Sequence, residues 1–270
     1  MKIKIFKINA FTKELFKGNP AAVCYLENEL PELLMQNIAY ENALPETAFI
    51  IKISNQHYKI RWFTPEIEMD LCGHATLASA FVIFNFYEKG SNCISFSSRS
   101  GALEVKKLKD LIFLNFPART GKMAVLPEII SRSLSIQPDE ILKSRDFLLI
   151  YKSQEVIENL LPNQEILTKV NIDPGGIIIS SIGTDCDFVS RFFTPQASIF
   201  EDPVTGSAHC TLIPYWSKKL NKKKLIAKQL SKRSGVLHCE DLDERVLIAG
   251  NCILFLAGFI KLKKLKTSVV

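Results

Sequence analysis

The chain carries one motif twice. In the first copy, Trp62-Phe63-Thr64-Pro65 leads through an acidic stretch to Cys72-Gly73-His74-Ala75-Thr76-Leu77. In the second copy, Phe192-Phe193-Thr194-Pro195 leads to Thr205-Gly206-Ser207-Ala208-His209-Cys210. The offset is 130 residues from Phe63 to Phe193 but 133 from Gly73 to Gly206, so the second copy holds three extra residues, which we place within 197–203. A spacing this large predicts two similar halves, each about one domain long.

The composition is that of a globular protein. Of the 270 residues, 47% are hydrophobic and 23% are charged, which is enough for two ordinary cores. The longest apolar stretch, 252–260, falls well short of the roughly 20 residues that a membrane-spanning helix needs. Lysines interrupt the apolar run at the N-terminus, which argues against a secretory signal. We therefore expect a cytoplasmic protein with no membrane partner.

The distribution of charges and cysteines indicates which partners and which redox state to expect. The net charge of +6 comes largely from lysine runs in the C-terminal third, such as 218–224 and 261–266. These runs lack the interleaved aromatic residues of a single-strand binder, so we expect no nucleic-acid partner. The seven cysteines are scattered and include no C-x-x-C pair, which indicates reduced thiols rather than a disulfide framework.

The hydrophobic spacing predicts a buried helix in each half. Ala75, Ala78 and Val82 space like a helix that ends before Gly90, and the second motif helix runs over about 206–220 with Pro214 bending its interior. A helix that is apolar on nearly every face belongs inside the fold. We therefore predict an α+β fold in which each half is a mostly antiparallel sheet curled around a central helix, with 117–122 as the linker.

Both motifs place a glycine where a strand gives way to a helix. Free backbone N–H groups and the positive end of the helix dipole make such a helix start a ready anion site, and glycine lets a ligand approach closely. If the starts at Gly73 and Gly206 face each other between the halves, they form a small-molecule site. The alternative is that both glycines only satisfy turn geometry, and the repetition favours the site.

Three side chains near these helix starts could carry chemistry. The helix dipole disfavours the cationic form of His74, which predicts a neutral imidazole able to share or donate a proton. Asp202 could be a helix cap, a common position for aspartate. Spacing alone favours Glu46 as a solvated loop residue at the start of a strand.

A metal site would require Cys72, His74, His209 and Cys210 to converge, because a closed site takes four ligands. The repeat does not place these soft ligands at equivalent positions. We therefore expect no metal.

Several short motifs, in order along the chain, resemble the PhzF (phenazine biosynthesis-like) family. The resemblance runs from about residue 8 to about residue 258, and its motifs are Gly18-Asn19-Pro20-Ala21-Ala22-Val23, Glu46-Thr47-Ala48-Phe49, Arg61-Trp62-Phe63-Thr64-Pro65, Leu71-Cys72-Gly73-His74-Ala75-Thr76-Leu77-Ala78, Ser190-Arg191-Phe192-Phe193, Glu201-Asp202-Pro203-Val204-Thr205-Gly206-Ser207-Ala208-His209 and Gln229-Leu230-Ser231. The family is cofactor-independent where it has been characterised, so the resemblance implies no cofactor.

The resemblance implies the diaminopimelate epimerase-like fold, with two pseudo-symmetric β-barrel halves that each wrap around a central helix. We expect residues 1–117 to form the first half and residues 118–258 the second. In that fold the last strand commonly returns to the first half, so residues of about 259–270 would join it. A homodimer is the candidate assembly.

The resemblance also implies an isomerase with its site between the halves. Glu46 matches the family's acid/base glutamate, and a glutamate placed at the interface can both give and take a proton. The implied catalytic residues are Glu46, His74 and Asp202, and the implied substrate-binding residues are Asn19, Gly73, His74, Gly206 and Ser207. The expected substrate is a small carboxylate-bearing metabolite, whose carboxylate the helix starts would hold.

Two positions depart from related patterns. Epimerases of the wider superfamily use two opposed cysteines, but here the counterpart of Cys72 is Thr205, whose hydroxyl is too weak an acid to replace a thiolate. The two-thiol mechanism is therefore excluded, while a one-sided epimerase that uses Cys72 or Glu46, and a non-catalytic ligand-binding protein, remain alternatives. Ser234 stands where the family has glycine, which we expect to affect only a surface turn.

Overall fold

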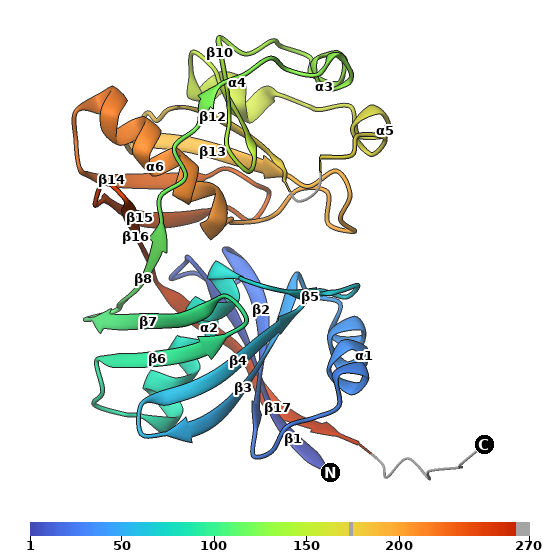
Figure 1. Ribbon diagram of the computed structural model, residues 1–270, viewed down its shortest axis with the longest axis vertical. Helices are drawn as coiled ribbons and strands as arrows, with labels where there is room; N and C mark the ends of the chain where they lie inside the picture. The colour runs from blue at the N-terminus through green and yellow to red at the C-terminus, as the bar shows by residue number, and fades with distance from the viewer. Residues whose placement is uncertain (173–174, 263–270) are drawn as a thin grey trace.

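The described residues of the computed structural model, 1–172 and 175–262, form one continuous sheet of 17 strands that runs through two lobes (Figure 1). The strands of the first lobe are β1 (Lys2–Ala10), β2 (Asn19–Leu26), β3 (Glu46–Ser54), β4 (His57–Phe63), β5 (Glu68–Met69), β6 (Cys93–Ser98), β7 (Gly101–Leu108) and β8 (Leu111–Pro117). Its helices are α1 (Glu32–Asn42) and α2 (Gly73–Val82), and a π-helical turn, η1 (Ile83–Tyr87), continues α2.

The second lobe follows directly after β8. Its strands are β9 (Lys122–Met123), β10 (Glu140–Lys143), β11 (Phe147–Ile150), β12 (Ile177–Ile182), β13 (Phe188–Phe193), β14 (Lys224–Gln229), β15 (Gly235–Asp241) and β16 (Arg245–Gly250). Its helices are α3 (Glu128–Ser133), α4 (Gln154–Asn159), α5 (Gln164–Leu167) and α6 (Gly206–Leu220). The last strand, β17 (Cys252–Lys261), leaves this lobe.

The strands of the two lobes pair in the same succession of directions. In the first lobe β1–β2 is antiparallel, β2–β3 parallel, β3–β4 antiparallel and β4–β6 parallel, and β6, β7 and β8 are antiparallel neighbours. The second lobe repeats this succession with β10 to β16. Pairing of β8 with β16 makes the sheet continuous across the lobes. The repeat in the sequence is thus matched by a repeat in strand pairing.

Each lobe buries its motif helix, as the apolar spacing predicts. From His74 to Val82, every residue of α2 except Phe81 is buried, and the helix packs against β1, β2, β3 and β8. Helix α6 packs against β14, β15 and β16 and buries Leu212 and Trp216. Because both helices begin where the lobes meet, their first turns lie together between the lobes.

The chain returns to the first lobe at its end. Strand β17 pairs antiparallel with β1 over its whole length, with Lys2 opposite Lys261 and Ala10 opposite Cys252. The returning strand therefore begins at Cys252, seven residues before the expected start at 259, and residues 263–270 lie outside the described residues. Among the described helices, none is both long and apolar enough to span a membrane. All seven cysteines are free.

Candidate active site

A cavity of about 480 Å³ lies between the two lobes, a size typical of small-molecule sites. Both copies of the motif contribute to its wall. The motif residues that line it are Thr64, Pro65, Cys72, Gly73 and His74 from the first lobe and Phe192, Thr194, Thr205, Gly206, Ser207 and Cys210 from the second. The cavity is therefore built from equivalent parts of both lobes.

The two helix starts meet at their glycines. A Cβ built on Gly73 would lie 3.5 Å from the Cα of Gly206, and the reverse contact has the same length. The residues before them, Cys72 and Thr205, make no side-chain capping bond to α2 or α6. The N–H groups of both first turns, which have no partner inside a helix, therefore lie at one wall of the cavity and suit an anionic ligand.

Glu46 and His74 form a close pair at this wall. Glu46 is the first residue of β3, and its Oε2 lies 3.0 Å from Nε2 of His74 in the first turn of α2. The Glu46 side chain is 15% exposed and that of His74 is 6% exposed. Glu46 is therefore not the solvated loop residue that spacing alone favours, because β3 holds it against a buried histidine at the cavity.

Asn19 connects this pair to the second lobe. Its Nδ2 donates to Asp202 Oδ1 and to the carbonyl of Val204, both at 2.9 Å, and lies 3.2 Å from Nδ1 of His74. The predicted substrate-binding residue Asn19 is fully buried and does not line the cavity. Its observed contacts place it as the bridge between His74 and Asp202.

A turn that contains Ser234 holds the residue before Asn19. Ser234 has a φ of 56°, in the left-handed region that favours glycine. Its carbonyl accepts a hydrogen bond from the Gly18 N–H at 2.8 Å, and Arg233 Nε donates to the Gly18 carbonyl at 2.7 Å. The main chain of this turn thus supports the strand start that positions Asn19, and that the serine itself affects only the turn stays a prediction.

Asp202 is held from three sides. Thr205 Oγ1 donates to Asp202 Oδ2, Asn19 donates to Oδ1, and Gln229 Nε2 donates to the Asp202 carbonyl at 2.7 Å. Gln229 Oε1 also accepts from the Thr205 N–H at 2.8 Å. Thr205 occupies the N-cap position of α6, and the Asp202 carboxylate accepts from the Asn19 and Thr205 side chains, so the helix-cap interpretation of Asp202 is wrong. The sequence reasoning assigned no role to Gln229, which fixes both residues.

The site combines two coupled titrating groups with unusual pKa values. Burial raises the pKa of Asp202 to about 6, His74 opposes this shift and Glu46 adds to it. Burial alone would lower the pKa of His74, but Cys72 and the Glu46 carboxylate outweigh it and hold that pKa well above the usual range. This raised pKa is opposite in direction to the shift that the helix dipole alone predicts for His74.

Cys72 lies beside this pair as a thiol. Its Sγ is 3.5 Å from Nδ1 of His74, and burial raises its pKa to about 11. Possible ligand atoms of Glu46, Cys72 and His74 all lie within 4.8 Å of one another, so these residues are the group that could hold a metal ion. A metal would have to displace protons that this environment retains on Cys72 and His74. The arrangement thus favours proton transfer over metal binding.

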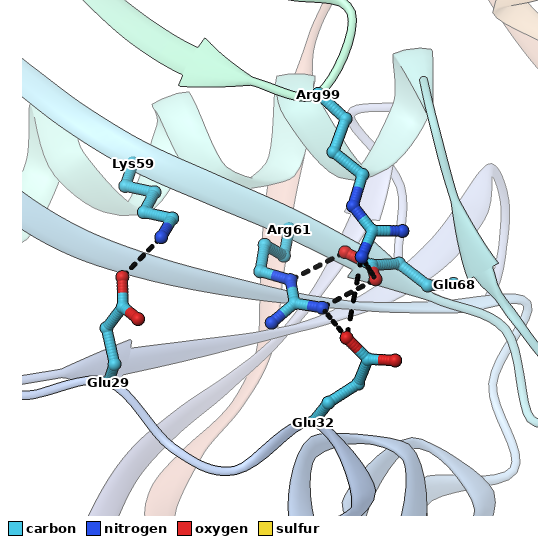
Figure 2. A network of polar contacts seen from close by, with 6 residues as sticks. All are labelled: Glu29, Glu32, Lys59, Arg61, Glu68 and Arg99. Carbon is cyan, nitrogen blue, oxygen red and sulfur yellow. Dashed lines mark hydrogen bonds and ion pairs between the residues drawn. The ribbon is translucent and has the colours of Figure 1, made fainter.

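An arginine–glutamate pair anchors the loop after each Phe-Thr-Pro motif. In the first lobe, Arg61 binds Glu68 through two contacts of 2.6 Å, and Arg99 binds Glu68 at 2.6 Å. Figure 2 shows this pair within a network that extends to Glu32 on α1. The anchored loop, 64–67, lines the cavity, so the pair fixes one cavity wall.

The second lobe repeats the pair. Arg191 contacts Glu201 at 2.7 and 3.1 Å, and its Nη1 donates to the carbonyls of Ile157 in α4 and of Leu160 directly after that helix. The loop from Thr194 to Glu201 is three residues longer than its counterpart from Thr64 to Glu68, which places the extra residues before Glu201. This overlaps the predicted interval of 197–203.

We expect Arg191→Met to lower the free energy of unfolding by about 2–4 kcal/mol, because it leaves Glu201 and two carbonyls without their donor. Arg61→Met should have a smaller effect, since the Arg61 side chain is 20% exposed and that of Arg191 is 10% exposed. Urea denaturation measures both, with Lys106→Met of an exposed ion pair as the control. A loss for Arg191→Met no larger than for the control would contradict this account.

Two arginines outside both motifs also line the cavity. Arg119 lies in the stretch 117–122, which the sequence predicts as a linker, and Arg145 lies between β10 and β11. The sequence does offer one signal for Arg119. It stands between a proline and a glycine in the segment that joins the two duplicated halves. The linker interpretation gave this stretch no part in the cavity, which Pro117 and Arg119 line.

The chain belongs to the family described as "Phenazine biosynthesis-like protein" (PhzC-PhzF), whose model matches residues 8–258. It is 42% identical to an "uncharacterized isomerase" of Pseudomonas aeruginosa over 97% of this chain and 100% of that protein. A PhzF-family crystal structure from Enterococcus faecalis is 44% identical, covers 97% of this chain and 100% of its own, and has a TM-score of 0.92. The family resemblance predicted from the motifs is confirmed.

The fold is also similar to that of a hydroxyproline epimerase from Agrobacterium vitis. That structure covers 96% of this chain and 92% of its own with a TM-score of 0.61 at 7% identity. An identity this low shows a common fold and says nothing of a common substrate. The chain therefore has a mixed α/β fold with a large sheet, shared by PhzF-family proteins and epimerases.

Proposed function

We propose that the protein is a cofactor-independent isomerase that moves a proton on a small carboxylate-bearing metabolite. The cavity between two pseudo-symmetric halves is the proposed active site. The observation that carries the proposal is the Glu46–His74 pair, which Asn19 links to Asp202 beside two helix starts. These groups would supply a carboxylate base, a cationic partner and an anion site to one cavity.

The proposed reaction is a proton shift between two carbons. The helix starts at Gly73 and at Gly206–Ser207 hold the substrate carboxylate. Glu46 accepts a proton from a C–H bond, and the electron pair of that bond moves into the adjacent unsaturated system. Glu46 then returns the proton to a second carbon, so the double bond shifts and no net charge or electron is lost.

His74 and Asp202 set the charge around Glu46. The His74 imidazole lies 3.0 Å from the Glu46 carboxylate, and the Asp202 carboxylate lies on the far side of Asn19. A change in the protonation of one member is therefore felt by the others. All of these steps are proton transfers that the chain's own side chains can perform.

The alternative is a one-sided epimerase, which Cys72 favours by lining the cavity next to His74. Incubation of candidate carboxylates in D2O distinguishes the outcomes. A double-bond shift with deuterium at a new carbon supports the isomerase, and deuterium with loss of configuration at one carbon supports the epimerase. Binding with neither change supports a ligand-binding protein on the same scaffold.

We place this isomerase in the cytoplasm, acting on a free metabolite as a homodimer. Seven unpaired cysteines support a reducing compartment. Size-exclusion chromatography with light scattering tests the assembly.

We expect Cys72→Ser to keep most of the activity, within about threefold of the parent. A thiol whose pKa burial raises to about 11 is protonated at neutral pH and is a poor base. The measurement is D2O exchange in parent and variant, together with iodoacetamide labelling of the parent with and without substrate. Substrate-protected labelling of Cys72 and complete loss of exchange in Cys72→Ser would instead establish the epimerase.

A further inference from the structure

Arg119 is held beside α6 by its main chain. Directly after β8, its backbone N–H donates to the carbonyl of Cys210 at 2.9 Å, and Cys210 lies one turn after Gly206. Both Arg119 and Cys210 line the cavity. Since the anchoring bond comes from the backbone, the guanidinium is left to face other groups.

One nitrogen of that guanidinium is buried without an acceptor. Nη1 of Arg119 has no hydrogen-bond partner among the described residues, and no ion pair within 4.0 Å involves Arg119 in that part of the chain. A guanidinium N–H that is hidden from water and unpaired is costly. The cavity wall at Arg119 therefore lacks a hydrogen-bond acceptor for this N–H group.

The carboxylate of Asp146 does not supply that acceptor. Asp146 Oδ1 accepts from the Gly176 N–H at 2.8 Å, while its Oδ2 is buried without a partner. Burial raises the pKa of Asp146, and the charges of Arg145 and Arg119 and the Gly176 N–H oppose the shift. Asp146 thus offsets some of the positive charge without contacting Arg119.

Arg119 and Arg145 line the cavity from the segments after β8 and before β11, whereas Glu46 and His74 line it from β3 and α2. The charge of Arg119 acts on Asp146 and Cys210, whereas burial, His74 and Glu46 set the pKa of Asp202. The cavity therefore has two regions that favour an anion. One is at the helix starts next to Glu46, and the other is at Arg119.

We propose that Arg119 binds a second anionic group of the substrate, so that the substrate is a small acid with two anionic ends. One end is the carboxylate at the helix starts, and this part rests on the proposed function. The other end is a carboxylate or a phosphate, which a guanidinium binds through charge-assisted, paired hydrogen bonds. A ligand of this kind supplies the acceptor that Nη1 of Arg119 lacks.

The test is isothermal titration of matched acids into the full-length protein. The diacids are succinate, glutarate and adipate, the monoacids butyrate, pentanoate and hexanoate, and the phosphorus analogues 3-phosphonopropionate and 4-phosphonobutyrate. We expect at least one doubly anionic ligand to bind the parent about tenfold or more tightly than the monoacid of equal length. Whether the diacid or the phosphonate binds more tightly identifies the second group.

The variants assign this preference to Arg119. Arg119→Gln should abolish it while leaving monoacid binding unchanged, and Arg119→Lys should restore part of it. Arg132→Gln, which removes an exposed arginine outside the cavity, should keep the full preference. Because Arg119→Gln removes an unpaired buried donor and keeps the backbone bond, its unfolding midpoint should be no lower than that of the parent, which separates lost binding from lost folding.

The inference is overturned if the parent prefers no doubly anionic ligand, or if Arg119→Gln retains the preference. Its failure is distinct from failure of the proposed isomerase. Binding does not require turnover, so an Arg119-dependent preference without any D2O exchange would uphold the anion site and refute the isomerase. Isomerisation of a monoacid at a rate that Arg119→Gln does not change would uphold the isomerase and refute the anion site at Arg119.

Discussion

Glu46→Gln should lower kcat at least about a hundredfold while leaving the fold intact, which is the usual scale for a lost general acid/base group. Glutamine keeps the size and one oxygen of the side chain but cannot accept a proton from carbon. It also removes the carboxylate that lies 3.0 Å from Nε2 of His74 and that helps to raise the histidine's pKa. The variant therefore loses both the base and part of the charge arrangement around it.

The measurement is the rate of D2O exchange and of product formation at saturating substrate, with unfolding midpoints to verify the fold. Glu66→Gln is a matched control, because Glu66 is exposed at the rim of the same cavity and has no contact with His74. Activity of Glu46→Gln within a few fold of that control would remove Glu46 from the mechanism. A pH profile that shifts in Glu46→Gln would add evidence that the pair titrates as a unit.

The sequence predicts the large elements because they depend on local patterns. Apolar spacing identifies α2 and α6 as central helices, and the two motifs place their first residues at Gly73 and Gly206. The repeated arginine before each Phe-Thr-Pro motif, Arg61 and Arg191, also reflects a shared structure, since each binds the glutamate that follows its loop. Because the motif occurs twice, a residue that recurs at the same position in both copies can be recognised from the sequence as part of the shared structure.

The charge state of the site could not be read from the sequence. The helix dipole at His74 is a local property, whereas the distance to Glu46 depends on how β3 packs beside α2. The neighbouring Cys72 and Glu46 raise the pKa of His74, whereas the dipole alone predicts a lower one. Arg119 was overlooked for a similar reason, because a linker reveals its role only when the two lobes are placed together.

The last expectation is that Asp202→Asn lowers kcat at least about tenfold and yet stabilises the protein at neutral pH. Asparagine preserves the shape of the side chain, keeps an oxygen for the Asn19 amide and offers an N–H to Thr205 Oγ1. It removes the negative charge that offsets His74 across Asn19, so the proton balance of the site is disturbed. Activity and stability should therefore move in opposite directions, as at other sites whose charge serves function.

The raised pKa of Asp202 determines whether Asp202→Asn should raise or lower the free energy of unfolding. The pKa of Asp202 is about 6 in the folded protein and about 3.9 in an unfolded chain, so the folded state holds the proton more tightly. Ionisation then opposes folding, and the contribution of this group to stability is lost as the pH rises from about 4 through about 6. At about 1.4 kcal/mol per pKa unit, the penalty above pH 7 is at most about 3 kcal/mol, and asparagine does not pay it.

Urea denaturation of parent and Asp202→Asn at about pH 5 and pH 8 tests the prediction. The gain in free energy of unfolding from Asp202→Asn should be about half as large at pH 5 as at pH 8, because at pH 5 Asp202 is largely protonated in the folded protein but already ionised in the unfolded chain. Asp185→Asn is the control, because Lys228 lowers the pKa of that exposed carboxyl and its loss should bring no gain. A variant that is less stable than the parent at pH 8 would show that Asp202 is held there as a stabilising carboxylate, which would contradict the role of burial in setting the charge of this site.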